Sequence, residues 1–438
     1  MRAYNRIAIA ITMFSITLGS CIKKMVPLHE VKPAVTHEMG KTLLRDSVWT
    51  QKEFMLSTFY AINNIGDTAI YRKILKQTKE AGLNLVEITF QNRVIVNMAL
   101  DIAESEGIKI LAQDLDAFSG FQTQAPSFTE DTVINNISRL SAYQMLEGYY
   151  VWDEPFIPNL TQAKELNDLF KEHDPSRLAF TVMLPSYGPY VWSDSTYPGY
   201  VNNYLSTINP DVISFNYYPF RENLTSTTLS TNDLWKDFGY IRGKALLSNK
   251  PLWYYFQAVS ISPDVVSIMN LERIRVQMFA ALAYGVKGLS YYTSHRALID
   301  PVTYEKTPMF NDLKALNTEV KNIGNFLLNK QSEKLYHTGV STLNRARYYL
   351  DQFSLSTLLN TAPNDLIIGV FGDTGTAKTL LVTNKSFSAA KTGNITLKSL
   401  KKVSEFNKST GATTLLSNST TSIAISLPPG GAALYIIE

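Results

Sequence analysis

The sequence has 438 residues, a formal net charge of +3 and 45% hydrophobic residues, which suits a globular protein with a large domain and a smaller module. The near-balanced charge, without a Lys/Arg stripe, argues against a nucleic-acid partner. The single cysteine, Cys21, excludes a disulfide framework and a cysteine-based zinc site. With five histidines and no His-x-x-x-His pair, we expect no metal and no cofactor.

The N-terminus has the layout of a secretory signal. Arg2 and Arg6 precede an apolar run, 7–18, which is too short to span a bilayer. Residues 18–21, Leu-Gly-Ser-Cys, resemble the lipobox of bacterial lipoproteins, and the resemblance implies cleavage before Cys21 and acylation of its thiol. We therefore expect a signal peptide at 1–20, a polar tether at 21–47 and a lipid anchor in a membrane of the bacterial cell envelope. An uncleaved signal with a leftover cysteine is the alternative.

From about residue 48 to 332, strand patterns alternate with helix patterns. The predicted strands are 54–60, 83–90, 108–113, the start of 146–155, 178–184, 211–218, 251–256 and 286–292. The predicted helices are 71–80, 94–106, one from about 129, 161–173, 270–284 and 310–328. This rhythm predicts an α/β fold, a (β/α)₈ TIM barrel. An open doubly wound sheet is less favoured because the sequence has no G-x-G-x-x-G turn and no P-loop.

Past residue 333 the helical periods disappear. Short β-rich runs follow, at 366–371, 379–384, 393–397, 422–427 and 433–437. Turn sequences such as Pro-Pro-Gly-Gly at 428–431 separate them. We expect a small all-β sandwich domain at 333–438. It contains no cluster of acids or histidines, so we expect it to support the barrel or to assist ligand binding.

The fourth predicted strand ends in Asp153, Glu154 and Pro155. Proline cannot donate to a β-ladder, so the strand stops there. Two carboxylates at the end of an apolar strand are costly unless they are paired or used. Catalytic residues of a TIM barrel lie at the carboxyl ends of its strands. The position therefore predicts a functional Glu154, with a capping or salt-bridged turn as the alternative.

Other polar and aromatic residues follow the remaining strands. Asp114 joins Asp153 and Glu154 as a candidate catalytic carboxylate. The candidate substrate-binding residues are Glu87, Trp192, Tyr217, Tyr218, Gln257, Tyr291 and His295. A structural contact is the alternative for Glu87, and capping of the last strand is the alternative for His295. Carboxylates among aromatic rings, without a G-x-S-x-G elbow, favour cleavage of an acetal, in which one acid protonates the leaving oxygen and a second assists.

The sequence Asp153-Glu154-Pro155 resembles the clan A glycoside hydrolases, retaining barrel enzymes whose fourth strand ends in Asn-Glu-Pro. The resemblance covers roughly residues 50–330 and implies that Glu154 is the general acid/base. The run 212–219 is also similar to that clan, in which an aromatic residue of this strand supports the nucleophile. Two positions depart from the pattern. Asp153 replaces the Asn, and strand seven ends in Gln257 where the clan has its nucleophilic Glu.

Three interpretations stay open because an amide cannot act as a nucleophilic carboxylate. The second carboxylate could come from another strand, with Asp114 first and Glu87 second. The enzyme could be inverting, with Asp153 or Asp114 activating water. Catalysis could also be lost. The sequence therefore predicts a glycoside hydrolase acting on oligo- or polysaccharide outside the cytoplasm, or a noncatalytic glycan-binding lipoprotein. In both cases the partners are a carbohydrate and, through the lipid, a membrane.

The lipid anchor gives the first testable prediction. Cys21→Ser should release the protein from the membrane fraction without changing its fold, because the lipid would be attached outside any core. Fractionation followed by immunoblotting measures the release, and circular dichroism checks the fold. Unchanged membrane association of the variant would contradict the lipoprotein interpretation.

Overall fold

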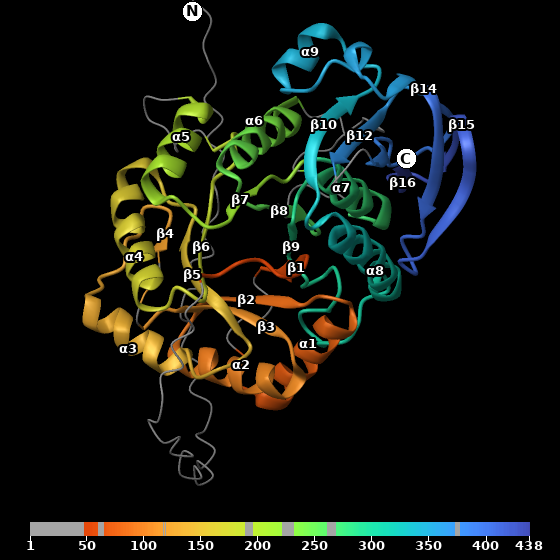
Figure 1. The fold of residues 1–438 in the computed structure, drawn as a ribbon. Helices are drawn as coiled ribbons and strands as arrows, with labels where there is room; N and C mark the ends of the chain where they lie inside the picture. Colours follow the sequence, from red (N-terminus) through yellow and green to blue (C-terminus); the bar gives the residue numbers. More distant parts are fainter. Residues whose placement is uncertain are drawn as a thin grey trace, which may run out of the picture. The chain divides into compact units, whose positions relative to one another are not determined.

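The computed structural model describes residues 48–59, 65–116, 118, 120–188, 196–220, 232–260, 269–372 and 377–438. Parallel strands alternate with helices through the first part of this chain (Figure 1). The barrel strands are β1 (Met55–Thr58), β2 (Leu85–Gln91), β3 (Lys109–Asp114), β5 (Leu146–Asp153), β6 (Leu178–Val182), β7 (Ile213–Asn216), β8 (Leu252–Gln257) and β9 (Gly288–Tyr292).

The strands close into a ring. Strands β7, β8, β9 and β1 form one parallel arc, and β2, β3, β5 and β6 form another. Parallel bridges Phe59–Glu87 and Met183–Phe215 join the two arcs at both ends. The predicted TIM barrel is therefore confirmed.

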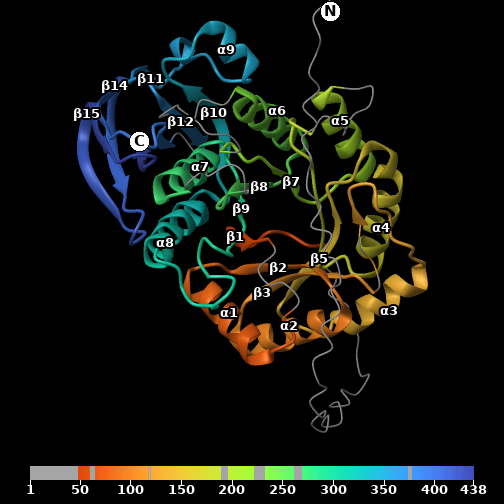
Figure 2. The ribbon, with the colours of Figure 1, turned by 180° about the vertical axis from the view of Figure 1, so that it is seen from behind.

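Eight helices of the described chain belong to the barrel. They are α1 (Thr68–Glu80), α2 (Arg93–Glu106), α3 (Glu130–Leu140), α4 (Leu160–His173, after the short 3₁₀ helix Ile157–Asn159), α5 (Tyr197–Ile208), α6 (Asn232–Ser248), α7 (Leu271–Ala283) and α8 (Phe310–Leu327). Figure 2 shows α1, α2 and α3 following one another outside β2 and β3. Within the described residues, no helix is long and apolar enough to cross a membrane.

The sequence patterns do not mark α5 and α6. Helix α5 begins with Tyr-Pro-Gly, and its buried face is built mainly from tyrosines, Tyr197, Tyr200 and Tyr204. In the sequence, these tyrosines resemble a continuation of the polar and aromatic segment before them, so no helix is predicted there. Thr196 caps the helix by accepting the N–H of Gly199 at 3.3 Å.

Side chains alternate between the interior of the barrel and the helix layer. Large apolar residues fill the interior, among them Met55, Leu111, Phe180 and Trp253. Trp253 even sits against Gly288, whose missing side chain leaves room for the indole ring. The barrel is thus a packed core, and open surface is left only at its ends.

Strand β5 breaks this alternation with a bulge. Its pairing with β6 shifts register between Tyr150 and Trp152. Val151 and Trp152 both pack in the outer core, whereas Tyr150 belongs to the interior cluster. The bulge therefore lets two residues three positions apart, Tyr150 and Asp153, face the same interior.

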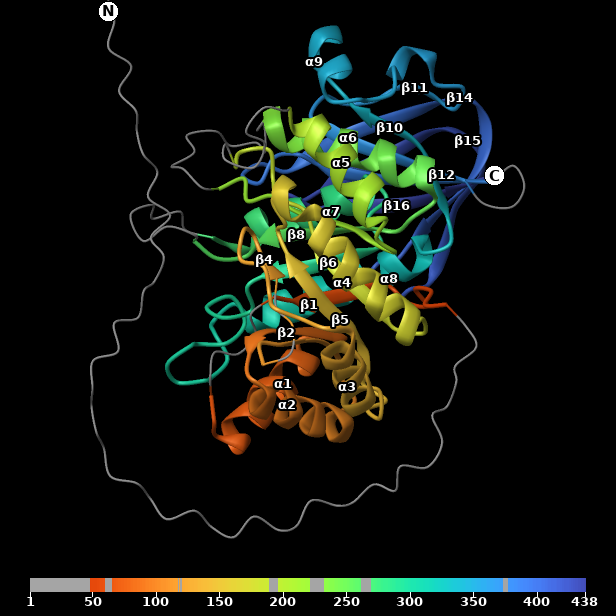
Figure 3. The same cartoon turned by 90° about the vertical axis from the view of Figure 1, so that its left-hand side faces the viewer.

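The C-terminal part is all-β, as predicted, and its strands pair in an antiparallel manner. Its elements are β10 (Gln331–His337), α9 (Thr342–Arg347), the 3₁₀ helix Phe353–Leu355, β11 (Leu359–Thr361), β12 (Leu366–Gly372), β13 (Lys378–Asn384), β14 (Lys391–Phe406), β15 (Thr413–Leu427) and β16 (Ala432–Ile437). The strand order is β10-β12-β13-β16-β14-β11, and β15 pairs with β14. Figure 3 shows β14 and β15 as a long hairpin.

Two details of this part differ from the sequence-based prediction. A short helix, α9, lies where no helical pattern is visible, because six residues are too few to show a period. Strands β14 and β15 are longer than the predicted runs 393–397 and 422–427. Their extra residues are mainly Ser, Thr and Lys, and the few apolar ones, such as Leu400 and Leu415, do not alternate regularly enough to extend the predicted runs.

The β domain packs against α7 of the barrel. Gly369 of β12 makes this contact possible, because a Cβ there would lie 2.3 Å from the carbonyl oxygen of Ala283. The hydroxyl of Thr383 on β13 donates to the carbonyl of Phe279 at 3.3 Å. Nearby, the hydroxyl of Tyr284 hydrogen-bonds to Nε2 of His337 at 3.0 Å.

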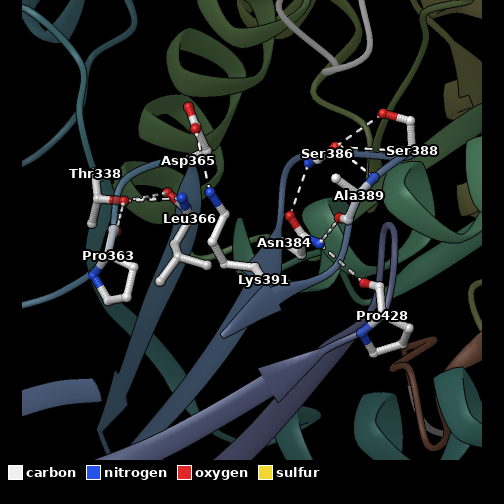
Figure 4. Close-up of polar contacts among 10 residues, drawn as sticks. All are labelled: Thr338, Pro363, Asp365, Leu366, Asn384, Ser386, Ser388, Ala389, Lys391 and Pro428. Atoms are coloured by element: carbon white, nitrogen blue, oxygen red, sulfur yellow. Dashed lines mark hydrogen bonds and ion pairs between the residues drawn. The ribbon is translucent and has the colours of Figure 1, made fainter. Parts of the chain in front are cut away.

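Polar side chains fix the turns at one end of this domain (Figure 4). The Asn384 amide donates to the carbonyls of Ala389 at 2.8 Å and Pro428 at 3.1 Å. The Thr338 hydroxyl donates to the carbonyl of Pro363 at 2.6 Å and accepts the N–H of Leu366 at 2.9 Å. All of these partners are backbone groups, so this network has a structural role.

The close approach of the paired strands β5 and β6 at Gly148 gives a stability prediction. Gly148→Ala would place a Cβ 2.1 Å from the carbonyl oxygen of Leu178, so we expect a loss of about 2 kcal/mol or more in unfolding free energy. Gly243→Ala in α6 is the matched control, because a Cβ there meets nothing within 4 Å. It should be neutral or slightly stabilising. Thermal unfolding compares the two, and equal melting temperatures would contradict the packing argument.

Candidate active site

Glu154 is the residue around which the carboxyl end of the barrel is arranged. Its backbone adopts a left-handed conformation with φ of +53°, and its N–H donates to the carbonyl of Val182 at 3.1 Å. Its side chain is half-buried. The amide of Gln122 donates to Oε2 at 2.9 Å, and the amide of Asn216 donates to Oε1. A left-handed glutamate is strained, and such strain is concentrated at functional sites.

Gln122 is positioned by a two-residue strand, β4 (Gly120–Phe121), that pairs with β5 at Trp152 and Asp153. A Cβ at Gly120 would lie 2.0 Å from the Trp152 ring, so only glycine allows this pairing. The N–H of Gln122 then donates to the carbonyl of Asp153 at 2.8 Å. The sequence-based prediction missed Gln122 because β4 is too short to show a strand pattern.

Asn216 ends β7, and its side chain points into the barrel mouth. Besides the bond from its amide to Glu154, its Oδ1 is buried and has no hydrogen-bond partner among the described residues. A buried acceptor without a partner is costly, and a ligand hydroxyl would satisfy it. Asn216 was also missed, although it immediately precedes the aromatic pair that the sequence singled out.

The two acids of the pair have raised pKa values. Burial raises the pKa of Glu154, and the amides of Asn216 and Gln122 partly oppose this. Burial also raises the pKa of Asp153 well above its usual range, and the charge of Glu154 raises it further. The hydroxyl of Tyr150 opposes this by donating to Oδ1 of Asp153 at 2.9 Å. The site therefore favours a protonated carboxyl, as a general acid requires.

Glu87 lies deeper, inside the barrel, and is completely buried. Its Oε1 accepts the hydroxyls of Ser57 at 2.7 Å and Ser290 at 2.8 Å, and its Oε2 accepts the hydroxyl of Tyr255 at 2.6 Å. Burial raises its pKa to about 7, against the effect of these donors. Because no atom of Glu87 reaches the surface, the structure does not place it where it could touch a substrate.

Asp114 faces away from the barrel mouth, into the helix layer. Its carboxylate pairs with Arg139, lies 3.4 Å from Nε of Arg93 and accepts the amide of Asn136 at 3.0 Å. The neighbouring Asp116 accepts the backbone N–H of Arg93 at 2.9 Å. These contacts correct the sequence-based assignment, because they give Asp114 a structural role and leave it no route to a substrate.

Gln257 is buried and fully engaged by backbone groups. Its Oε1 accepts the N–H of Phe220 at 2.7 Å, and its Nε2 donates to the carbonyls of Phe220 at 3.2 Å and Val259 at 3.1 Å. It therefore fixes the backbone that follows β7 and β8. The predicted hydrogen bond from Gln257 to a ligand is not supported, because its donor and acceptor groups are already used.

The alternation of side chains along a strand decides which aromatic candidates face the interior of the barrel and which face the helices. Tyr291 faces outward and donates to Oδ1 of Asn317 at 2.6 Å, and Tyr217 is buried in the outer core. Neither lies at the mouth. Tyr218 and His295 are half-buried beyond the ends of β7 and β9. The remaining predicted residues, Trp192 and Cys21, lie outside the described residues.

Four half-buried aromatic rings and the buried ring of Phe59 lie at the mouth beside Glu154. Phe59 stands at the centre, with its ring 6.2 Å from Phe90 and 5.9 Å from Tyr292. Phe90 continues to Phe121 at 5.5 Å, and Tyr292 continues to Tyr218 at 4.6 Å. We call these five residues the aromatic arc. Such faces can cover the apolar side of a sugar ring.

In the described chain, no group of three or more His, Cys, Asp and Glu residues could hold a metal ion.

Comparison with known proteins shows the fold. No protein-family model matches the sequence, and no curated protein matches it. The structure is similar to a glycoside hydrolase family 5 protein from Bacteroides vulgatus, with a TM-score of 0.54, 13% identity and coverage of 89% of each chain. It is also similar to alpha-galactosidase I from Mortierella vinacea, with a TM-score of 0.50, 11% identity and coverage of 88% of this chain and 96% of that one. Its structural neighbours are thus TIM-barrel glycoside hydrolases.

The role of Asp114 is testable. Asp114→Ala would leave Arg139 without its carboxylate, so we expect a loss of about 2 kcal/mol or more in unfolding free energy. Asp116→Ala is the matched control, because its exposed carboxylate holds a single backbone N–H and should cost less. Thermal unfolding gives the comparison. If Asp114→Ala unfolds like the wild type but no longer binds or cleaves a glycan, Asp114 has a catalytic or binding role and not a structural one.

Proposed function

We propose that this protein hydrolyses O-glycosidic bonds of an oligo- or polysaccharide, with Glu154 as the general acid. One observation carries the proposal. Glu154 is a half-buried, left-handed glutamate at the carboxyl end of β5, and two side-chain amides hold its carboxyl group in place. The glycosidase-like fold supports it, as does the aromatic arc beside the acid.

Different side chains at the mouth would bind the sugar and transfer the proton. A sugar ring would stack on the aromatic arc, and one of its hydroxyls would donate to Oδ1 of Asn216. Glu154 would transfer its proton to the glycosidic oxygen as the bond to the anomeric carbon breaks. Burial raises the pKa of Glu154, which favours the protonated form that a general acid needs.

Asp153 is the better choice for the second carboxyl group. Of the sequence-based alternatives, Asp114 is committed to arginines and Glu87 is sealed in the barrel, whereas Asp153 is 7% exposed next to Glu154. Its carboxylate could activate water or stabilise the positive charge that develops at the anomeric carbon. We further propose that the protein acts at the bacterial cell envelope, anchored through the lipid predicted at Cys21.

A noncatalytic glycan receptor is the second candidate function. Gln257 favours it, because this residue stands where the clan A resemblance implies a nucleophile, and its amide is fully engaged by backbone groups. A receptor would use the same aromatic arc and the same acceptor on Asn216, without transferring a proton.

Glu154→Gln tests the proposal. The change keeps the shape of the side chain but removes the transferable proton, and the new amide can accept from only one of the two amides that bond to Glu154. Hydrolysis of a substrate with a poor leaving group should fall by about 10²- to 10⁴-fold. An activated aryl glycoside needs little protonation, so its cleavage should fall much less. Steady-state kinetics on both substrate types measures the difference.

Glu147→Gln is the matched control, because Glu147 lies on the same strand, β5, but pairs with Lys109 at the opposite end of it. It should leave both rates near wild type. Full activity of Glu154→Gln on the poor leaving group would contradict the role of Glu154. Binding of one glycan by wild type and variant, with no cleavage by either across a broad glycan panel, would favour the receptor.

A further inference from the structure

Three lysines lie together at the amino ends of β8 and β9, the end of the barrel opposite the candidate site. Lys250 comes two residues before Leu252, the first residue of β8, and Lys287 comes directly before β9. The N–H of Lys287 donates to the carbonyl of Leu252 at 2.7 Å. The side-chain amide of Gln51 donates to the carbonyl of Lys287 at 2.6 Å, which places Lys52 beside them. We call Lys52, Lys250 and Lys287 the basal lysines.

None of the basal lysines is paired with a carboxylate of the described chain. Nζ of Lys287 donates to the carbonyl of Leu327, and Nζ of Lys250 donates to the carbonyl of Pro210. These acceptors are neutral, so they leave the charges in place. Lys52 is exposed and forms no ion pair within the described residues. The three positive charges can therefore act on an anion outside the chain.

The acids beside the basal lysines have other partners. Asp211 pairs with Lys171 at 2.9 Å, and Glu53 pairs with Lys109 at 2.9 Å. Lys321 acts on Glu53 as a further cation. The amino ends of the strands from β7 to β1 thus carry more positive than negative charge, and such a surplus attracts a negatively charged surface.

The last turn of α6 adds exposed apolar side chains to the same surface. Leu247 is 85% exposed and Leu246 is 39% exposed. The N–H of Lys250 donates to the carbonyl of Ala245 in this turn at 3.0 Å, so the leucines lie next to a basal lysine. Lysines beside exposed leucines are typical of surfaces that lie on an anionic bilayer, where the apolar side chains enter the headgroup layer. We call the basal lysines together with Leu247 the basal patch.

The described chain begins at this end of the barrel. The N–H of Trp49 donates to the carbonyl of Pro175, three residues before β6, at 2.8 Å. Its indole N–H donates to Oε1 of Glu147 at the start of β5, also at 2.8 Å. The segment 21–47, which we expect to be a lipid-bearing tether, therefore joins the fold at the end that carries the basal patch.

The basic residues of α1 differ from the basal lysines, because acids neutralise them. Arg72 pairs with Glu106 at 2.8 Å, and Lys73 pairs with Glu305 at 2.5 Å. Of the two basic surfaces, the basal patch is thus the better one for an anionic partner.

We propose that the basal patch binds the headgroups of an anionic phospholipid bilayer, with Leu247 entering the headgroup layer, so that the mouth of the barrel faces away from the membrane. The proposal does not depend on hydrolysis of a glycan. Three lysines give weak binding that salt screens. Cys21→Ser is therefore still expected to leave the membrane fraction at physiological salt.

Vesicle co-sedimentation of the full chain carrying Cys21→Ser tests the patch without the lipid anchor. Binding to vesicles of phosphatidylglycerol mixed with phosphatidylcholine is divided by binding to vesicles of phosphatidylcholine, so that any contribution of the apolar run 7–18 cancels. Each lysine contributes about fivefold, so the ratio should be on the order of 100 at low salt. The preference should disappear at about 1 M salt, where the Debye length is about 3 Å.

Three exposed positions give the variants and the control. Lys52→Glu reverses one basal charge and should lower the ratio about 25-fold. Lys76→Glu on α1 changes the net charge equally and should leave the ratio within about twofold of its original value. Leu247→Ser should weaken binding to the anionic vesicles about threefold or more.

Equal ratios for Lys52→Glu and Lys76→Glu would overturn the proposal, as would the absence of a preference for anionic vesicles. A loss in Lys52→Glu without a loss in Leu247→Ser would also overturn it, because a polyanion in solution needs the charge but not the leucine. Since no glycan is present, each of these results is distinct from a failure of the glycosidase proposal.

Energy transfer to a dye on the lipid headgroups tests the orientation. Cys21→Ser removes the only cysteine, so one dye can be attached at Ser248→Cys beside the patch or at Thr123→Cys beside Gln122 at the mouth. Both positions are exposed. Transfer on anionic vesicles should be stronger from position 248. Equal or stronger transfer from position 123 would overturn the orientation.

Discussion

The candidate site depends on the cost of burying carboxyl groups inside a packed barrel. Glu87 and Asp153 are buried among aromatic rings, and Glu154 is half-buried above them. Water is largely excluded, so hydroxyls and amides must do what solvent does elsewhere. The hydroxyls that donate to Glu87 and the amides that donate to Glu154 meet this requirement. The same burial raises the pKa values that make an acid catalyst at this place physically reasonable.

Backbone geometry delivers those donors to the right place. The bulge in β5 turns Asp153 inward, and the left-handed Glu154 then redirects its side chain toward Gln122 and Asn216. The two amides come from distant parts of the sequence, one after the short β4 and one at the end of β7. Only the closed barrel brings them within reach of one carboxyl group. The site is therefore a property of the ring of strands and not of any single strand.

The fold could be predicted from the sequence because eight apolar runs with intervening helical periods leave few alternatives. Glu154 and Asp153 could be predicted because acids directly after an apolar strand are costly without a use. Asp114 and Tyr291 also follow or end strands, but they face outward. Counting by two from an interior residue such as Leu111 would have separated Asp114 from the mouth. The bulge in β5, however, has no visible sequence signal. Counting by two along β5 therefore gives the wrong face for Asp153.

The amides, and every residue of the aromatic arc except the predicted Tyr218, could not be predicted because their residue types carry no chemical signal of their own. Gln122, Asn216 and Phe59 gain their roles only from their neighbours. Glu87 presents the opposite case. A leucine or glutamine would fill its place without the cost of desolvating an acid. Three hydroxyls from three other strands, Ser57, Tyr255 and Ser290, instead converge on its carboxyl group. Because the charge of Glu87 also raises the pKa of Asp153, an arrangement this costly is easier to explain by its effect on the candidate site than by packing alone.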